Sequence, residues 1–371
     1  MTELDEKDLL RGIRSWVEIE SQTADTEGVN AMLSLVDGLY GDLGAKVVRI
    51  PGESGIGDML SISPAGAGDE PGILVLSHLD TVHARGTLQN LPWSIDGDRA
   101  YGPGTFDMKG GAYIAFAAFT ELANANISTP LPVRFLYTSD EEFGSRISRP
   151  HIVEHAKNAK YVLVTEPSRD GNFVVGRAGS SRYRITVTGK AAHSGGNHHQ
   201  GRNAILEMAH HIIEFESLTD YDRGLKFNVG EIKGGETANM IPEKCSIHLD
   251  IRHGTKADAD EFDQRVRNLQ TRDPENSISV TGQINRIGYA NPEIQKDLFA
   301  HVQELARELG MTGGGSVSGG GSDANFTAND VPTLDGLGVL GDGAHTLHEH
   351  LLISSLVPRK TLFRNLFETL N

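Results

Sequence analysis

The chain has 371 residues, of which 38% are hydrophobic, and this length is enough for more than one hydrophobic core, so we expect two domains. Its formal net charge of −16 repels phosphate backbones and anionic lipid, and no dense run of Lys or Arg offsets it, so we expect neither a nucleic-acid nor a membrane partner. A single cysteine, Cys245, excludes an internal disulfide, and the charged start and the lack of an 18-residue apolar stretch predict a cytoplasmic protein.

The first part of the chain has the pattern of an α/β domain. Apolar residues at helical spacing predict two opening helices, and short apolar runs bounded by Gly or Pro then predict buried strands. This order predicts a parallel-type sheet with helices on both faces. The predicted strands are 73–76, 133–137 and 161–164, and the predicted helices are 9–17, 32–39, 111–123, 293–309 and 354–370.

A different pattern begins near Gly176. Apolar and polar residues alternate there, which is typical of half-buried strands, and two helical segments interrupt them. The order predicts a smaller four-stranded α+β domain over residues 177–284, inserted into a first domain made of 1–176 and 285–371. Its predicted strands are 184–188, 227–232, 246–251 and 277–281, and its predicted helices are 203–216 and 257–269.

Metal-capable side chains follow each of the three buried strands. The first strand ends at His78 and Asp80, the second at Glu141 and Glu142, and the third at Glu166. Because the carboxyl ends of strands form the ligand crevice of open α/β sheets, we expect these side chains to converge. Any one of these acids alone is equally typical of a solvated turn. The three strand ends together favour a metal site.

Two further segments carry candidate ligands. Asp107 lies in the glycine-rich turn 102–111 just before a predicted helix, where its two oxygens can bridge two ions or cap that helix. The segment 341–350 contains three histidines, His345, His348 and His350, and as a cluster they indicate a metal ligand, with the residue that binds left open among them. Nitrogen and carboxylate oxygen are the only donors, a set that suits zinc, with cobalt or manganese as substitutes.

These residues lie in motifs that resemble the zinc metallopeptidase family of aminoacylase, acetylornithine deacetylase and succinyl-diaminopimelate desuccinylase. The resemblance covers nearly the whole chain and is closest to the glutamate carboxypeptidase branch, which we base on the segments 227–228, 239–242 and 319–326. The family motifs are Ser77-His78-Leu79-Asp80-Thr81-Val82, Gly102 to Gly111, Asp140-Glu141-Glu142, Glu166-Pro167, Ala192-His193-Ser194-Gly195 and His345-Thr346-x-x-Glu349.

The resemblance implies a two-zinc centre in the first domain. It places Asp107 between the two ions, with His78 and Glu166 on one and Glu142 and His345 on the other. Paired metals lower the pKa of a shared water and polarise the scissile carbonyl.

The resemblance also implies the residues that move protons and orient the ligands. Asp80 orients the imidazole of His78, and Glu141 is the general base. Neighbours in a regular strand point to opposite faces, so we predict a tight turn at Glu141 and Glu142 that lets both face the site.

The inserted domain is implied to be a lid and dimerisation domain, so we expect a homodimer. The resemblance gives His193 the role of donating a hydrogen bond to the oxyanion across the dimer. It also implies that the substrate carboxylate is bound by Asn239, Arg252, Gly320, Gly321 and Ser322, although Arg252 also suits a surface charge and the glycine run 313–322 also suits a flexible linker.

The predicted function is a two-zinc hydrolase that cleaves an amide or peptide bond next to a free carboxylate of a small substrate, as a glutamate-carboxypeptidase-like enzyme or an N-acyl-amino-acid amidohydrolase. A dipeptidase and an ammonia-releasing aminohydrolase are alternatives on the same scaffold. A catalytically silent, peptide-binding relative is a further alternative, but such a protein would have lost a ligand or the base, and none is missing here.

Overall fold

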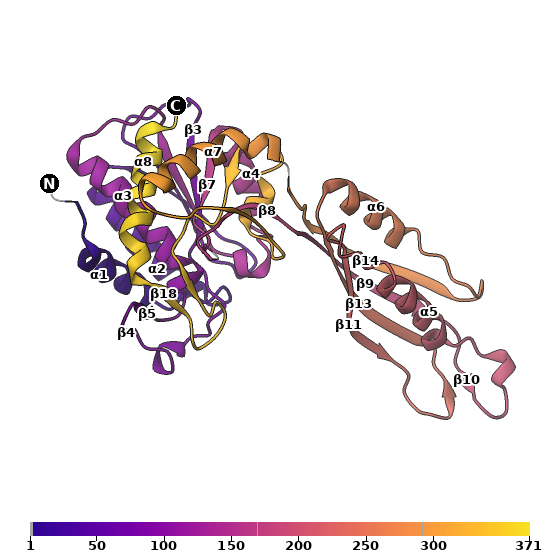
Figure 1. Cartoon of the computed structure of the whole chain (residues 1–371). Coiled ribbons are helices and arrows are strands. Elements are labelled where there is room, and N and C mark those ends of the chain that lie inside the picture. The colour runs from indigo at the N-terminus through magenta and orange to yellow at the C-terminus, as the bar shows by residue number, and fades with distance from the viewer. Residues whose placement is uncertain (1–2, 169, 291) are drawn as a thin grey trace. The chain divides into compact units, whose positions relative to one another are not determined.

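The structure is a computed structural model that describes residues 3–168, 170–290 and 292–371. It contains two compact units, which are drawn in Figure 1. The boundary expected after residue 284 falls inside a strand that continues to Arg286. The first unit consists of Met1–Val175, Asn291–Val317 and Ser322–Asn371, and the second of Gly176–Ala290 and Ser318–Gly321.

A six-stranded sheet forms the centre of the first unit, in the order β1-β2-β6-β3-β7-β16. Strands β6, β3, β7 and β16 are parallel, whereas β1 and β2 add an antiparallel edge that the sequence patterns did not predict. Every residue of β3 is buried, as expected for a central strand covered on both faces. The strands are β1 Lys46–Ile50, β2 Met59–Ser63, β3 Gly72–His78, β6 Val133–Thr138, β7 Ala159–Val164 and β16 Thr333–Leu334.

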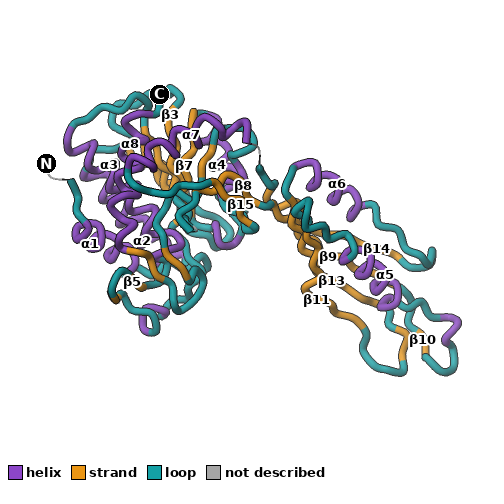
Figure 2. The backbone as a smooth tube through the Cα atoms, in the orientation of Figure 1, coloured by secondary structure: helices purple, strands orange, loops and turns teal. Residues whose placement is uncertain are grey.

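Helices flank this sheet, as Figure 2 shows, and the predicted fold class is confirmed. Fully buried side chains such as Trp16 and Tyr40 fill the space between them, and each contributes roughly 1.5–3 kcal/mol by leaving water. No helix in the described part of the chain is long and apolar enough to cross a membrane. The helices of this unit are α1 Glu6–Val17, α2 Thr26–Asp42, α3 Gly110–Ala125, α4 Arg149–Lys157, α7 Pro292–Glu308 and α8 Leu356–Thr369.

A second, smaller sheet brings the end of the chain to the turn that carries Asp107. Strand β18 (His350–Leu352) pairs with β5 (Arg99–Tyr101), and the order of this sheet is β17-β18-β5-β4. Because β5 leads directly into the turn at 102–109, the loop between β17 (Gly341–Asp342) and β18 lies beside that turn. Strand β4 is Ser94–Asp96.

The second unit is a four-stranded antiparallel sheet, β11-β13-β9-β14, with two helices packed on one face. Alternate residues of β9 and β13 are buried against those helices, which accounts for the alternation in the sequence. The elements are β9 Gly179–Thr188, β10 Ala192–His193, α5 Ala204–Glu216, β11 Lys226–Gly234, β12 Met240–Ile241, β13 Lys244–His253, α6 Lys256–Arg267 and β14 Ser277–Arg286. A separate two-stranded ribbon pairs β8 (Phe173–Arg177) with β15 (Gly315–Ser318).

Candidate metal centre

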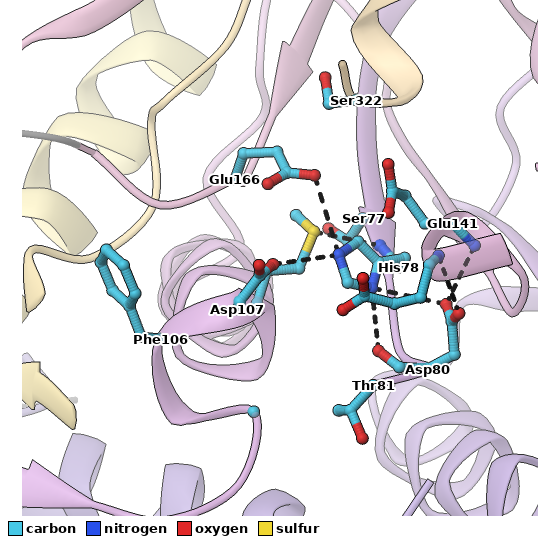
Figure 3. Close-up of polar contacts among 12 residues, drawn as sticks. Ser77, His78, Asp80, Thr81, Phe106, Asp107, Glu141, Glu166 and Ser322 are labelled. Atoms are coloured by element: carbon cyan, nitrogen blue, oxygen red, sulfur yellow. Dashed lines mark hydrogen bonds and ion pairs between the residues drawn. The ribbon is translucent and has the colours of Figure 1, made fainter. Parts of the chain in front are cut away.

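The structure brings the predicted ligands together at the carboxyl ends of β3, β6 and β7. They form two clusters, and within each cluster the potential ligand atoms lie within 4.8 Å of one another. Figure 3 shows Asp107 and Glu166 turned toward the imidazole of His78. One cluster is His78, Asp107 and Glu166, and the other is Asp107, Glu142 and His345.

Asp107 belongs to both clusters through different oxygens. Its Oδ1 lies 3.3 Å from His78 Nε2, and its Oδ2 lies 3.3 Å from His345 Nε2. His345 Nε2 is also 3.3 Å from Glu142 Oε2, and His78 Nε2 is 3.7 Å from Glu166 Oε1. Two donors that each lie about 2.1 Å from a tetrahedral ion are about 3.4 Å apart, so these separations suit ions between the side chains.

Two carboxylate oxygens in these clusters lack a hydrogen-bond partner among the described residues. They are Asp107 Oδ1 and Glu142 Oε1, and both are buried. A buried acceptor without a partner is costly, because its desolvation is not compensated. A cation in each cluster would satisfy both oxygens, and imidazole with carboxylate is a donor set that zinc accepts. The residues present therefore fit a pair of metal ions.

The side chains of the clusters perturb one another strongly. Burial acts to raise the pKa of Asp107, but the imidazoles of His345 and His78 outweigh it and hold that pKa well below its usual range. The carboxylates of Asp107 and Glu142 raise the pKa of His345 to about 10. At His78, burial acts to lower the pKa of the imidazole. Asp107 and Asp80 outweigh it and raise that pKa well above its usual value. Without an ion, the imidazoles carry the positive charge that the acids require.

Asp80 fixes the tautomer of His78, mainly through its main chain. The backbone carbonyl of Asp80 lies 2.9 Å from His78 Nδ1, and its carboxylate Oδ1 lies 3.4 Å from the same nitrogen. Because a carbonyl only accepts, Nδ1 carries the proton in the neutral ring, and the Nε2 lone pair faces Asp107 and Glu166. The Asp80 carboxylate instead accepts from Thr23 Oγ1 at 2.8 Å and from two backbone N–H groups of the turn after β6.

That turn contains Glu141 and Glu142 and is a short 3-10 helix, Glu141–Phe143. The predicted tight turn is thus confirmed, and the chain leaves extended geometry where Glu142 joins one of the clusters. Gly144 ends the turn with a left-handed backbone, φ 90°, and its N–H donates to the Glu141 carbonyl at 2.7 Å. Glu141 is only 8% exposed, and Asp80 accepts from its N–H and from that of Glu142.

Asp107 lies in an irregular turn, Thr105–Lys109, that precedes α3. The residue at the helix N-cap is Lys109, and no side chain caps this helix, so the alternative in which Asp107 is an N-cap is wrong. The Asp107–Met108 peptide bond is cis. The aspartate side chain lies 3.3 Å from each of two imidazoles, those of His78 and His345.

His345, and not its histidine neighbours, lies with Asp107 and Glu142. His348 is exposed, and the ring of His350 packs 5.2 Å from that of Tyr101. His345 has a left-handed backbone, φ 67°, which costs a non-glycine residue roughly 1–2 kcal/mol. Such a cost is typical of side chains that the surrounding structure aims at a functional site.

His193 and Asn239 lie side by side in the second unit. Strand β10 pairs with β12, and the Ser194 N–H donates to the Asn239 carbonyl at 3.0 Å. His193 Nδ1 accepts from two backbone N–H groups, of Gly195 and Gly196, each at 3.1 Å. Since these groups can only donate, the proton of the neutral ring is on Nε2, which gives this exposed imidazole an outward N–H donor.

Arg252, also in the second unit, is paired within its own strand. Its Nε and Nη2 donate to the two oxygens of Asp250 at 2.6 and 3.3 Å. The same carboxylate accepts from Arg182 Nε at 3.1 Å. The side chain of Arg252 is 31% exposed, so a ligand carboxylate that reached it would compete with Asp250.

The glycine run is more ordered than its composition suggests. Its middle forms β15, and the carbonyls of Gly320 and Gly321 each lie 3.4 Å from Arg177 Nη1. Ser322 is fully buried and caps a 3-10 helix, Asp323–Phe326, and its hydroxyl donates to Asp335 Oδ2 at 2.6 Å. The Ser322 hydroxyl is thus used within the protein, which leaves the backbone as the part of this loop that can meet a ligand.

Glu349 is the main feature that the sequence patterns did not assign. It closes the motif that begins at His345, and that position was the only available signal. Its carboxylate is fully buried and accepts from the backbone N–H of Asp107 at 2.9 Å.

Comparison with known proteins places these residues in context. The model of a family described as peptidase family M20/M25/M40 matches residues 74–369. Carboxypeptidase G2 from a Pseudomonas species is 30% identical over 362 residues, which are 95% of this chain and 86% of that protein. A succinyl-diaminopimelate desuccinylase from Rickettsia bellii is 27% identical over 97% of this chain and 96% of its own length. The crystal structure of aminopeptidase PepT from Bacillus cereus has the same fold, with a TM-score of 0.82, 22% identity and 99% of both chains covered.

Proposed function

The chain belongs to peptidase family M20/M25/M40, and on that premise we propose that it is a two-zinc amidohydrolase that cleaves an amide or peptide bond next to a free carboxylate. The family inferred from the motifs is confirmed, and the chain is a hydrolase. The observation that carries the finer proposal is Asp107, whose two oxygens face two separate ligand clusters.

The proposed ligands are the members of the two clusters. His78 and Glu166 would hold one ion, Glu142 and His345 the other, and Asp107 both. Zinc suits these donors best, with cobalt or manganese as substitutes. When bound, such a pair acidifies a water molecule and polarises the scissile carbonyl.

Proton transfer is the proposed role of Glu141. Its carboxylate would take a proton from the attacking water and deliver it to the leaving amine, a role worth about 10² to 10⁴ in rate. The N–H groups of Glu141 and Glu142 both donate to the Asp80 carboxylate, which supports a fixed position for the base.

A homodimer would complete the site. We propose that the partner subunit's His193 donates its Nε2–H to the oxyanion, which the tautomer fixed by Gly195 and Gly196 supports. The surface next to the open edge strand β11 supports a second copy as partner: Leu206 and Ile213 on α5 and Ile232 on β11 are 58%, 70% and 53% exposed. Apolar side chains beside an unpaired strand edge favour association.

The substrate would be a small molecule with a free carboxylate. Arg252 and Asn239, together with backbone groups at Gly320 and Gly321, are the proposed contacts, and the name of the Pseudomonas relative, a carboxypeptidase, agrees with this class. We place the reaction in the cytoplasm, since a chain with one cysteine needs no oxidising compartment to form an internal disulfide.

The test is hydrolysis by purified protein across a panel of N-acyl and N-aminoacyl amino acids and simple aromatic amides, with metal content measured in parallel. We expect two ions per chain, activity on substrates with a free carboxylate, and loss of that activity on chelation. Glu141→Gln is the control, and it should keep both ions and lose at least about 10²-fold in kcat. Full activity in Glu141→Gln or in the chelated protein would refute the mechanism, and preference for dipeptides or for aromatic amines would indicate a dipeptidase or an aminohydrolase.

A further inference from the structure

Glu349 ties together two segments that carry predicted ligands. Its Oε1 accepts the backbone N–H groups of Phe106 and Asp107, and its Oε2 accepts that of Gly104, each at 2.9 Å. Glu349 follows His345 by four residues in the loop between β17 and β18. One carboxylate thus spans the Asp107 turn and the His345 loop.

The segment that carries His78 is connected to Glu349 through His83. This residue follows His78 by five positions, and its Nε2 lies 2.5 Å from Glu349 Oε2. The side chains of His83 and Glu349 are 8% and 1% exposed, so water does not compete for this contact. Glu349 is therefore the point where the segments of His78, Asp107 and His345 meet.

The local backbone is shaped for this anion. Gly104 has a left-handed backbone, φ 73°, and a Cβ at this position would lie 2.7 Å from Thr81 Cγ2. That conformation directs the Gly104 N–H, together with those of Phe106 and Asp107, toward one carboxylate, as in other backbone anion sites. Both Glu349 oxygens are occupied by these donors, and Glu349 is outside both ligand clusters.

We infer that Glu349 is a positioning residue that sets the spacing of the metal ligands and holds the Asp107 carboxylate between the two clusters. This inference rests on the proposed function. Because Asp107 belongs to both clusters, a shift of its backbone moves a ligand of both sites at once. Loss of Glu349 should thus weaken both ions together, whereas loss of His345 should weaken one.

The experiment is a titration of metal-stripped protein with Co²⁺, followed by calorimetry and by the visible absorption of bound cobalt. In Glu349→Gln one carboxylate oxygen becomes an NH2 group, so a donor then faces backbone N–H groups that need an acceptor. We expect affinity for both ions to fall roughly 10- to 100-fold, as for other residues that orient metal ligands, with altered cobalt bands. Glu349→Asp retains both oxygens and should recover part of the affinity.

Glu121→Gln is the matched control. Glu121 is a buried carboxylate of the same unit that accepts the Leu4 N–H at 2.7 Å and pairs with Lys360 at 2.6 Å, but it contacts none of the ligand segments. This variant should melt at a lower temperature and bind cobalt as the wild type does. Should Glu349→Gln fail to fold, His83→Leu removes the donor of one of the four contacts and should weaken both ions less strongly.

Each outcome is decisive. Wild-type affinity and unchanged cobalt bands in Glu349→Gln, or in His83→Leu if only that variant folds, would overturn this inference alone. An equal loss of affinity in Glu121→Gln would also overturn it, since the effect would then be general destabilisation. A wild-type chain that binds fewer than two ions would instead refute the proposed function.

Discussion

The candidate residues of the two units are held in different ways. In the first unit His78 and Glu166 are 2% and 8% exposed, and their neighbours come from segments far apart in the sequence. In the second unit His193 and Asn239 are exposed and are fixed by bonds within short turns. The first set is preorganised by the core, whereas the second has a fixed donor direction on an exposed surface.

This difference predicts separate effects on metal binding and on turnover. Side chains at the clusters should change the metal content of each chain. Side chains of the second unit should change kinetics and leave the metals in place. The predictions below test that separation.

The largest effect should come from Asp107→Asn. The amide replaces the oxygen that serves one cluster with an NH2 group and removes the negative charge from both, so bound zinc should fall from two ions to at most one per chain. Activity should fall by roughly 10³-fold or more, because paired ions supply several kcal/mol to the transition state. Metal analysis and kinetics measure both effects, with Asp342→Asn, at the exposed end of β17, as control. Two firmly bound ions in Asp107→Asn would show that this residue is not shared.

Much of the metal centre follows from the sequence, because its ligands lie at the ends of buried strands. The apolar run of β3 places His78 at the carboxyl end of the sheet, and the same argument places Glu142 and Glu166. The position of His345 came from the family motif, because the loop lies 179 residues beyond Glu166 and periodicity does not connect them.

Other features depend on contacts that no local pattern contains. Strands β1 and β2 have only 5 residues each, and the exposed positions of β1 blur its apolar signal. The pair of Arg252 with Asp250 depends on side-chain direction along one strand, and the contact of Glu349 with Gly104 joins residues 245 positions apart. These interactions required the folded chain.

His193→Ala should have the next largest effect. Loss of one oxyanion donor costs about 10²- to 10³-fold in kcat, and metal content should stay at the wild-type value. His198→Ala, an exposed histidine of the same loop, should be neutral. Reduced metal content in His193→Ala would show that a residue of the second unit also affects metal binding, contrary to the proposed separation.

A mixture of variants tests the dimer. If the partner subunit's His193 serves each site, combining His193→Ala with Glu141→Gln chains creates one intact site in each mixed dimer. After random exchange about half of the dimers are mixed, and each mixed dimer has one intact site out of two. Activity should therefore recover to about one quarter of the wild-type value. No recovery after subunit exchange would place His193 in its own subunit's site.

Arg252→Gln should have a smaller effect, confined to KM. A charge-assisted bond to a carboxylate contributes about 1.5–3 kcal/mol, so KM for substrates with a free carboxylate should rise roughly tenfold or more with kcat little changed. Arg182→Gln, which also loses a bond to Asp250, is the matched control and should leave KM nearly unchanged. An equal rise of KM in both variants would show that the effect comes from Asp250 and its two arginine partners together, and not from Arg252 alone.

The smallest effect should be a pH dependence of stability in the metal-free chain. The folded pKa of His345, about 10, lies above its ordinary value of 6.5 because of Asp107 and Glu142. Stability from this raised pKa is fully present below pH 6.5 and is lost as pH rises toward 10. The side chain is 53% exposed, so solvent screening reduces the gain, and we expect the melting temperature to fall by only about 2 °C between pH 7 and 10. His345→Gln should flatten this part of the profile, and calorimetry of both chelated proteins measures the difference. Identical profiles would show that the His345 imidazole does not carry the compensating charge in the metal-free centre.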